Sequence, residues 1–286
     1  MRWQGRREST NVEDRRGRGP AMRTGAGIGC GGLLLVLLLS FVTGQDPLAL
    51  LQLFETTSVQ VPQSGPQLPG EVAPPGDELG RFASVVLADL EETWSALFAR
   101  AGVRYRPPTL VLYTGAVQSA CGFSSAASGP FYCPADQKVY LDLSFFDELD
   151  RRFGAPGDFA QAYVIAHEVG HHVQNLLGIS DQVHSAQQRS GSRAEANQYS
   201  VALELQADCL AGVWAYHAHH ERQLLEPGDV EEGLAAAAAI GDDRLQRQAT
   251  GTVQPESWTH GSSAQRVAWL RGGMETGDPD ACETLR

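Results

Sequence analysis

The segment Tyr163–Val173, with the sequence YVIAHEVGHHV, constrains the fold most, because it places polar groups inside an otherwise apolar helix. We predict that this helix spans residues 158–177. His167 and His171 are four residues apart, so their side chains lie one turn apart on the same face. Two imidazoles so placed can bind one zinc ion, and Glu168 beside them can take a proton from the metal's water. The sequence therefore predicts a buried zinc site on this helix.

A catalytic zinc site needs a third protein ligand, and the sequence LELQADC on a later predicted helix is its best source. Glu204 and Asp208 are again four residues apart, and the residues around them are apolar. Two acids on an apolar helix are costly unless a cation compensates them. We expect Glu204 to be the third ligand and Asp208 to hold the free ring nitrogen of a zinc-bound histidine. The exchange of these two roles stays open.

Two other histidines are weaker candidates. His260 lies in the sequence THGSSAQRV, just before a predicted helix, where an imidazolium could stabilise the oxyanion of a tetrahedral intermediate. An ordinary exposed loop histidine is the alternative. His172 lies about 100° round the helix from His171. We therefore expect His172 to be solvated, or to contact one of the zinc-binding residues, rather than to bind zinc itself.

An apolar segment, residues 27–44, divides the chain. Arginines precede it and acidic residues follow it, which orients an N-terminus to the cytoplasm. We predict a basic cytoplasmic N-terminus (residues 1–26), a transmembrane signal-anchor (27–44), a Pro-rich linker (45–76) and an extracytoplasmic domain (77–286). The protein is then a single-pass membrane protein that contacts the membrane through its N-terminal helix. A cleaved signal peptide that ends near residue 44 stays open.

The charge balance bears on the partners. The chain has 34 acidic and 22 basic residues, a net charge of −12, and the basic excess lies before the apolar segment. The remainder is therefore strongly acidic and repels phosphate backbones. We do not expect nucleic acid as a partner.

The cysteines fit an exported domain. Cys30 lies in the apolar segment, which leaves four cysteines outside the cytoplasm, where disulfides form. We expect Cys121 to pair with Cys133 across a short loop and, by elimination, Cys209 to pair with Cys282. Free buried thiols are the alternative.

The pattern of helices and strands predicts a mostly helical α+β domain with a small sheet. Strands are expected at 109–113 and 138–143, and the second could pair with an extended substrate if it lies at the sheet edge. Helices are expected from Asp77, after Ser192, from Asp229 and from Ser263.

These motifs, in this order, resemble those of the bacterial membrane-anchored neutral zinc metallopeptidase family, of the thermolysin-like gluzincin type. The resemblance extends from MRWQGRRESTNVEDRRG through CGFSSAASGPFYCP, VYLDLSFF and HEVGHHVQ to ELQADC and THGSSAQRV. It implies a zincin-like fold, in which the HExxH helix packs against a second, Glu-bearing helix. It also implies zinc on His167 and His171, with Glu168 as the general base. A Glu-x-x-x-Asp pair of related gluzincins maps onto Glu204 and Asp208.

The expected function is that of a membrane-anchored zinc metalloendopeptidase with one zinc ion per chain and a protein or peptide substrate. In this reaction Glu168 takes the proton from the attacking water, and zinc, with His260, holds the oxyanion. One alternative is a catalytically silent, zinc-stabilised extracytoplasmic binding module of the same fold. A second is another HExxH hydrolase, such as a deformylase, but such enzymes typically use a cysteine ligand, and here the cysteine spacing favours disulfides.

Overall fold

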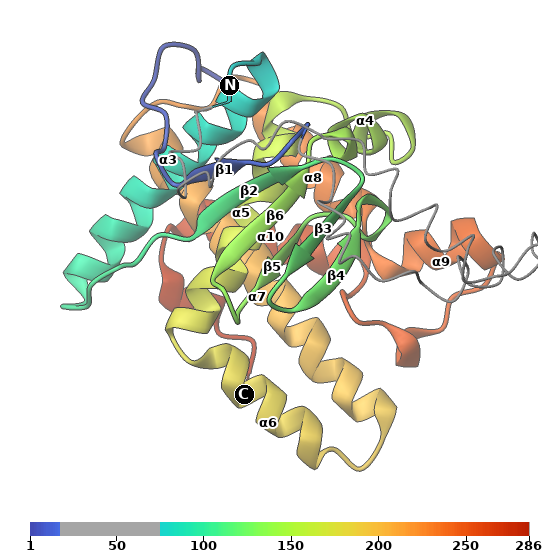
Figure 1. Cartoon of the computed structure of the whole chain (residues 1–286). Coiled ribbons are helices and arrows are strands. Elements are labelled where there is room, and N and C mark those ends of the chain that lie inside the picture. Colours follow the sequence, from blue (N-terminus) through green and yellow to red (C-terminus); the bar gives the residue numbers. More distant parts are fainter. Residues whose placement is uncertain (18–74, 286) are drawn as a thin grey trace, which may run out of the picture. The chain divides into compact units, whose positions relative to one another are not determined.

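The computed structural model describes residues 1–17 and 75–285 (Figure 1). These residues are mostly helical with a small sheet, so the predicted α+β class is confirmed. The described helices are α3 (Glu78–Arg100), α4 (Ser144–Arg151), α5 (Asp158–Leu176), α6 (Ile179–Arg189), α7 (Arg193–His220), α8 (Asp229–Ala239), α9 (Asp242–Thr250) and α10 (Ser263–Thr276). The described strands are β1 (Val12–Asp14), β2 (Thr109–Tyr113), β3 (Ala116–Ser119), β4 (Gly122–Ser125), β5 (Phe131–Cys133) and β6 (Lys138–Asp142).

The main sheet has the strand order β1-β2-β6-β5, and β5 alone runs antiparallel to its neighbour. The sequences of β2 and β6, TLVLY and KVYLD, are almost continuously buried, as expected for central parallel strands. The proposal that residues 138–143 offer a free edge to substrate is therefore wrong, since β6 lies between β2 and β5. In the sheet that the described residues form, β5 occupies one edge and β1 the other. Strands β3 and β4 form a separate hairpin.

The N-terminal residues 1–17 are part of the same core. Strand β1 pairs in parallel with β2, and Val12 lies opposite Leu110. Trp3 is only 6% exposed, and its ring packs edge-on against Phe82 of α3 at a centroid distance of 5.4 Å. The segment is also tied to α3 by hydrogen bonds to Glu91. This differs from the expectation that the domain begins at residue 77.

The predicted localisation as a single-pass membrane protein is contradicted. Within residues 1–17 and 75–285, no helix has the length and apolar character needed to cross a membrane. The predicted transmembrane segment, residues 27–44, lies outside the described residues, as does the linker up to residue 74. The described residues 1–17 form one compact unit with residues 75–285, so a cytoplasmic N-terminus with the domain on the opposite side of a membrane is also wrong.

Three helices behind the sheet carry the residues of interest, namely α5, α7 and α10 (Figure 1). Helices α7 and α10 cross at two glycines. A Cβ atom on Gly273 would collide with the carbonyl oxygen of Cys209, and one on Gly212 would collide with that of Leu270. Helices α5 and α7 approach almost as closely, since a Cβ on Gly170 would lie 3.0 Å from the carbonyl oxygen of Ala207. Small residues therefore bring the three helices together.

Both expected disulfides are present. Cys121–Cys133 ties the β3–β4 hairpin to the edge strand β5, with a Cα–Cα distance of 5.8 Å. Cys209–Cys282 ties α7 to the short 3-10 helix η3 (Pro279–Cys282) near the C-terminus, with a Cα–Cα distance of 5.5 Å.

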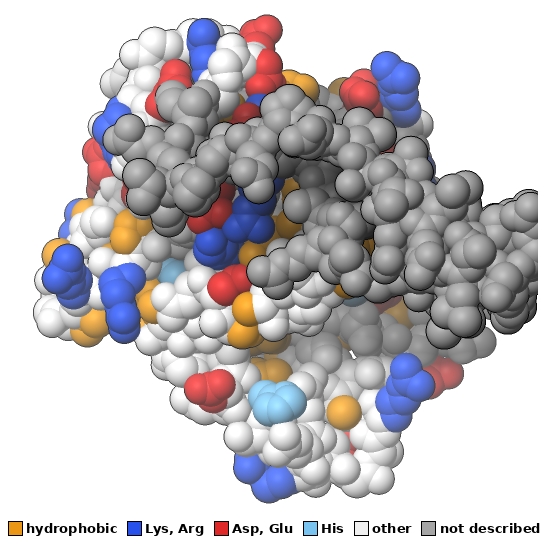
Figure 2. All heavy atoms as spheres, in the orientation of Figure 1, with side chains coloured by type: hydrophobic (Ala, Val, Ile, Leu, Met, Phe, Trp, Pro, Cys, Tyr) orange, Lys and Arg blue, Asp and Glu red, His pale blue; other side chains and the backbone are white. Residues whose placement is uncertain are grey.

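Charged side chains of both signs are mixed on the face in Figure 2. Asp and Glu side chains lie close to Lys and Arg side chains there, and hydrophobic side chains form small groups between them. The part of this face that the described residues show is therefore not a uniform basic surface. The expectation that nucleic acid is not a partner stays a prediction.

Candidate metal centre

Helices α5 and α7 bring together two histidines and a glutamate. The ligand atoms of His167, His171 and Glu204 all lie within 4.8 Å of one another. The Glu204 carboxylate is 3.1 Å from Nε2 of His167 and 3.4 Å from Nε2 of His171. This is the donor set of a His2Glu zinc site, in which three protein ligands leave one coordination position open.

Asp208 lies on the other side of His167. Its Oδ1 atom is 2.9 Å from Nδ1 of His167, and the side chain is fully buried. Asp208 therefore contacts the ring nitrogen that faces away from Glu204, as a residue that orients a metal-binding histidine does. The geometry favours Glu204 over Asp208 as the ligand.

The sequence analysis missed two partners of Asp208. Arg266 of α10 donates two hydrogen bonds to its carboxylate, from Nε at 2.8 Å and from Nη2 at 2.9 Å. The hydroxyl of Tyr163 on α5 donates a third, at 2.6 Å. Arg266 is only 2% exposed, and its position in the apolar stretch AQRVAWL was an available signal. A buried guanidinium needs an anion, as the buried acids need a cation.

The charges of this cluster shift the pKa values of its members. Burial alone would raise the pKa of Asp208, but Arg266 and His167 outweigh it and lower this pKa to about 2. Burial alone would lower the pKa of His167, but Asp208 and Glu204 raise it to about 9. The pKa of His171 is likewise raised by Glu204 against the effect of burial. In the metal-free protein at neutral pH, His167 therefore carries a hydrogen on both ring nitrogens, and a metal ion must displace the one on Nε2.

The second histidine is fixed in the same way as the first. Nδ1 of His171 is 2.9 Å from Oε1 of Gln174, one turn further along α5. Because a side-chain amide oxygen only accepts, this Nδ1 carries the hydrogen. Both imidazoles therefore use Nδ1 for the protein and direct Nε2 towards Glu204.

A cleft of about 960 Å³ opens onto this cluster. Glu168 lines it together with His167 and His171 and is 8% exposed, but it is not part of the three-residue ligand group. Apolar side chains also line the cleft, among them Phe145, Phe153, Val164, Ile240 and Leu245. The cleft thus combines a carboxylate near the ligand group with apolar surface beside it.

His260 lines the same cleft, and its side chain is half-exposed at 51%. Asp242, which the sequence analysis missed, fixes the loop that carries His260. Its Oδ2 atom accepts hydrogen bonds from the backbone N–H groups of Thr259, His260 and Gly261. Its Oδ1 atom lies 3.4 Å from Nδ1 of His260, and this contact raises the pKa of the imidazole.

His172 is neither solvated nor directed at the cluster. Its Nε2 donates to the carbonyl oxygen of Arg106 at 2.6 Å, so its Nδ1 accepts from the hydroxyl of Tyr132 at 3.0 Å. Burial lowers its pKa to about 4. His172 therefore stays neutral and joins α5 to the edge strand β5.

A second group of acids lies at the other end of α5. Asp158, Asp229 and Glu232 are also close enough to share a cation. The α-amino group of Met1 already lies among them, 2.9 Å from Asp158 and 3.3 Å from Asp229. This group therefore has its positive partner and gives no reason to invoke a metal.

Comparison with known proteins assigns the chain to a family. Residues 1–285 match the family described as "Putative neutral zinc metallopeptidase". The uncharacterized protein YpfJ of Escherichia coli (strain K12) is 49% identical over 292 positions, which cover 100% of this chain and 99% of YpfJ. The uncharacterized protein Rv2575 of Mycobacterium tuberculosis is 50% identical over 191 positions, 63% of each chain. No solved structure matches significantly. With a match along almost its whole length, the chain belongs to the neutral zinc metallopeptidase family.

Proposed function

We propose that this protein is a zinc-dependent metalloendopeptidase that holds one zinc ion on His167, His171 and Glu204. One observation carries the proposal. Both imidazoles are held at Nδ1 by acceptors, Asp208 and Gln174, so that both Nε2 atoms converge on Glu204 at a cleft. When bound, zinc would supply a Lewis acid that lowers the pKa of a water molecule and polarises the substrate carbonyl.

Glu168 is the proposed general base. It follows the first ligand directly in the sequence and lines the cleft without joining the ligand group. From this position its carboxylate takes a proton from the attacking water and returns it to the leaving amine. A purely structural zinc site has no use for such a base, and it usually closes its fourth position with another ligand. The free carboxylate in an open cleft therefore supports a hydrolase over a silent binding module.

His260 and Asp242 are proposed to act on the substrate carbonyl. The raised pKa of His260 favours the imidazolium, which donates a hydrogen bond to the oxygen that becomes negatively charged. The three backbone hydrogen bonds to Asp242 fix the loop that carries His260. This pair therefore stabilises the transition state from the rim of the cleft.

The cleft supports a peptide as the substrate. Its volume of about 960 Å³ lies at the upper end of the range of ligand sites, about 300–1,000 Å³. The edge strand β5 contributes Phe131 and Tyr132 to the lining, which also includes the apolar side chains named above. An extended peptide could pair with this strand and place an apolar side chain among the apolar residues of the lining.

The test uses the full-length chain, purified under oxidising conditions, and its Glu168→Gln variant. Zinc content is measured by atomic absorption, and proteolysis is measured as the release of peptides from denatured casein. We expect one zinc ion per chain in both proteins, with cleavage by the wild type only and loss of cleavage on chelation. Zinc in both proteins without cleavage would refute the peptidase and favour the silent binding module. The absence of zinc from both would refute the ligand set.

A further inference from the structure

The hydrogen bond that fixes His171 is the first link of a longer chain. Gln174 is fully buried, and its Nε2 donates to the carbonyl oxygen of Leu203 at 2.7 Å and to Oε1 of Gln206 at 3.0 Å. Gln206 is 7% exposed, and its Nε2 donates to the carbonyl oxygen of Cys282 at 3.0 Å. This chain of hydrogen bonds therefore runs from the imidazole of His171 on α5, across α7, to Cys282, the residue at which η3 ends.

The direction of every hydrogen bond in this chain is determined by its far end. Backbone carbonyl oxygens only accept, so the amide nitrogens of both glutamines must face Leu203 and Cys282. The amide oxygens then face the other way, and the oxygen of Gln174 is presented to Nδ1 of His171. This arrangement requires the hydrogen of His171 on Nδ1 and leaves Nε2 free for a metal.

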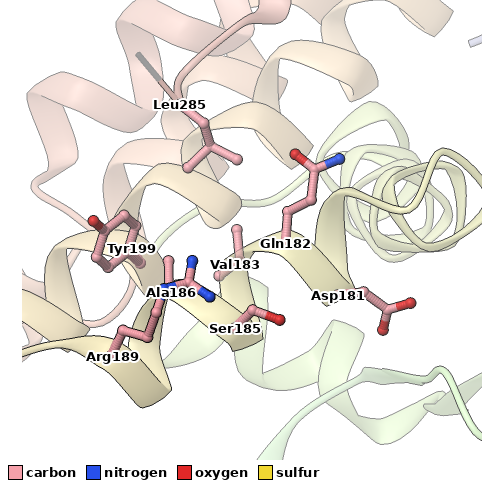
Figure 3. A pocket seen from close by; sticks show the side chains of 8 residues that line it. All are labelled: Asp181, Gln182, Val183, Ser185, Ala186, Arg189, Tyr199 and Leu285. Carbon is pink, nitrogen blue, oxygen red and sulfur yellow. The ribbon is translucent and has the colours of Figure 1, made fainter.

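The far end of the chain is itself fixed. Cys282 is fully buried and bonded to Cys209 of α7. Beyond it, the hydroxyl of Thr284 donates to the carbonyl oxygen of Ala202 at 2.7 Å. Figure 3 shows Leu285 pointing into the pocket between α6 and α7, above Val183. Residues 282–285, called the C-terminal segment below, therefore lie against α7, which carries Glu204 and Asp208, and reach α6.

We propose that Gln174 and Gln206 are positioning residues for His171, and that the disulfide-bound C-terminal segment completes this support. The inference rests on the proposed zinc site. It assigns to the Cys209–Cys282 bond a role in the metal affinity of a site in which neither cysteine is a proposed ligand. Removal of an oriented partner of a metal-binding histidine typically weakens metal binding by about 10- to 100-fold.

The test measures the zinc affinity of the full-length protein by competition with a chromophoric chelator. Gln174→Met should weaken zinc binding by about 10-fold or more, because the acceptor for Nδ1 of His171 is lost. Gln206→Met should weaken it less, but by at least about threefold, and so should the joint change of Cys209 and Cys282 to Ala. When combined, these last two changes should weaken binding little more than either alone, since both break the same chain.

A matched control separates this effect from a general loss of stability. The joint change of Cys121 and Cys133 to Ala also removes a disulfide, but that bond joins the β3–β4 hairpin to β5 and is not part of the chain. Its zinc affinity should match that of the wild type. Urea unfolding of each metal-free variant shows whether it is folded. If one variant fails to fold, the zinc affinities of the remaining folded variants test the proposal.

The outcomes also distinguish this inference from the proposed function. If the wild type binds no zinc, or if His167→Ala binds as tightly as the wild type, the zinc site and the inference both fail. If the wild type binds zinc through His167 but folded Gln174→Met binds it with unchanged affinity, only the inference is overturned. If removal of either disulfide weakened zinc binding equally, the inference would also be overturned, because the effect would then not depend on the hydrogen bonds that connect His171 with Cys282.

Discussion

The substitution Trp3→Ala tests whether the first residues of the chain belong to the folded domain. Trp3 lies more than 70 positions before α3, yet its ring packs against Phe82 of that helix and is only 6% exposed. If the N-terminal segment were a separate basic tail, the loss of one aromatic side chain from it would leave the stability of the domain unchanged. The structure requires the opposite.

The expected magnitude follows from the buried area. A buried tryptophan removes about 150–250 Å² from water, which corresponds to about 4–6 kcal/mol at about 25 cal/mol per Å². This is an upper estimate, since the unfolded chain already buries part of that area. Replacement of a core tryptophan by alanine typically costs about 3–5 kcal/mol. We therefore expect Trp3→Ala to lower the free energy of unfolding by about 4 kcal/mol, a large share of the usual total of about 5–15 kcal/mol.

The assay is urea unfolding followed by far-UV circular dichroism, with a chelator present so that metal binding does not contribute. The matched control is Gln4→Ala, since Gln4 is the next residue and is exposed. It should change the free energy of unfolding by no more than about 0.5 kcal/mol. A loss below about 1 kcal/mol for Trp3→Ala would refute the placement of the N-terminal segment in the core.

Three further predictions concern the metal centre. Asp208→Asn leaves Arg266 buried without its anion, so urea unfolding of the metal-free protein should show a loss of about 3–5 kcal/mol, and an unchanged stability would contradict the buried pair. The pKa of His167 is raised to about 9, so its stabilising contribution is complete below about pH 6.5 and is lost as the pH rises through 9. Metal-free protein should therefore lose up to about 3 kcal/mol between pH 6.5 and 9.5, whereas a metal-free His167→Gln variant should lose less. Because Asp242 raises the pKa of His260, Asp242→Asn should move the alkaline limb of the kcat/KM profile to lower pH; an unmoved limb would exclude His260 as the acid.

The elements that the sequence predicted well are those with a local signal. Helix α3 begins after Asp77, whose carboxylate accepts from the backbone N–H of Gly80, and α7 begins after Ser192, whose hydroxyl accepts from that of Glu195. Helix α10 begins at Ser263 as expected, but its N-cap is the preceding residue, Ser262, which forms a capping box with Gln265. Such caps depend on residues three apart, so a sequence reveals them directly.

The missed elements lack such a signal. Helix α6 has the polar sequence ISDQVHSAQQR, in which Val183 alone is buried, and in α9 Asp242 alone is buried. Neither has an apolar face from which a helix could be predicted. Strand β1 is three residues long and depends on pairing with β2, almost 100 positions later. Its burial is a property of the fold that no neighbouring residue indicates.

The charged groups of the metal centre show the same limit of prediction from sequence. The sequence located the unusual acids, Glu204 and Asp208, but assigned one cation to both. In the structure each has its own partners, since Arg266 neutralises Asp208 while the two histidines face Glu204. An apolar helix with two acids indicates that positive charge is needed nearby, but the helix that supplies it, α10, follows more than 50 residues later.

This division of charge has a consequence for the metal-free protein. Since the pKa of His167 is raised to about 9, this histidine is protonated at neutral pH and paired with Glu204 and Asp208, and the pKa of His171 is raised in the same direction by Glu204. A zinc ion that binds there displaces the proton on Nε2 of His167, so part of its positive charge replaces charge that the buried cluster already holds. Asp208 keeps Arg266 throughout. Chelation should therefore leave a folded protein at neutral pH, in contrast to small zinc domains that unfold without their metal, and the affinity for zinc should increase steeply as the pH rises.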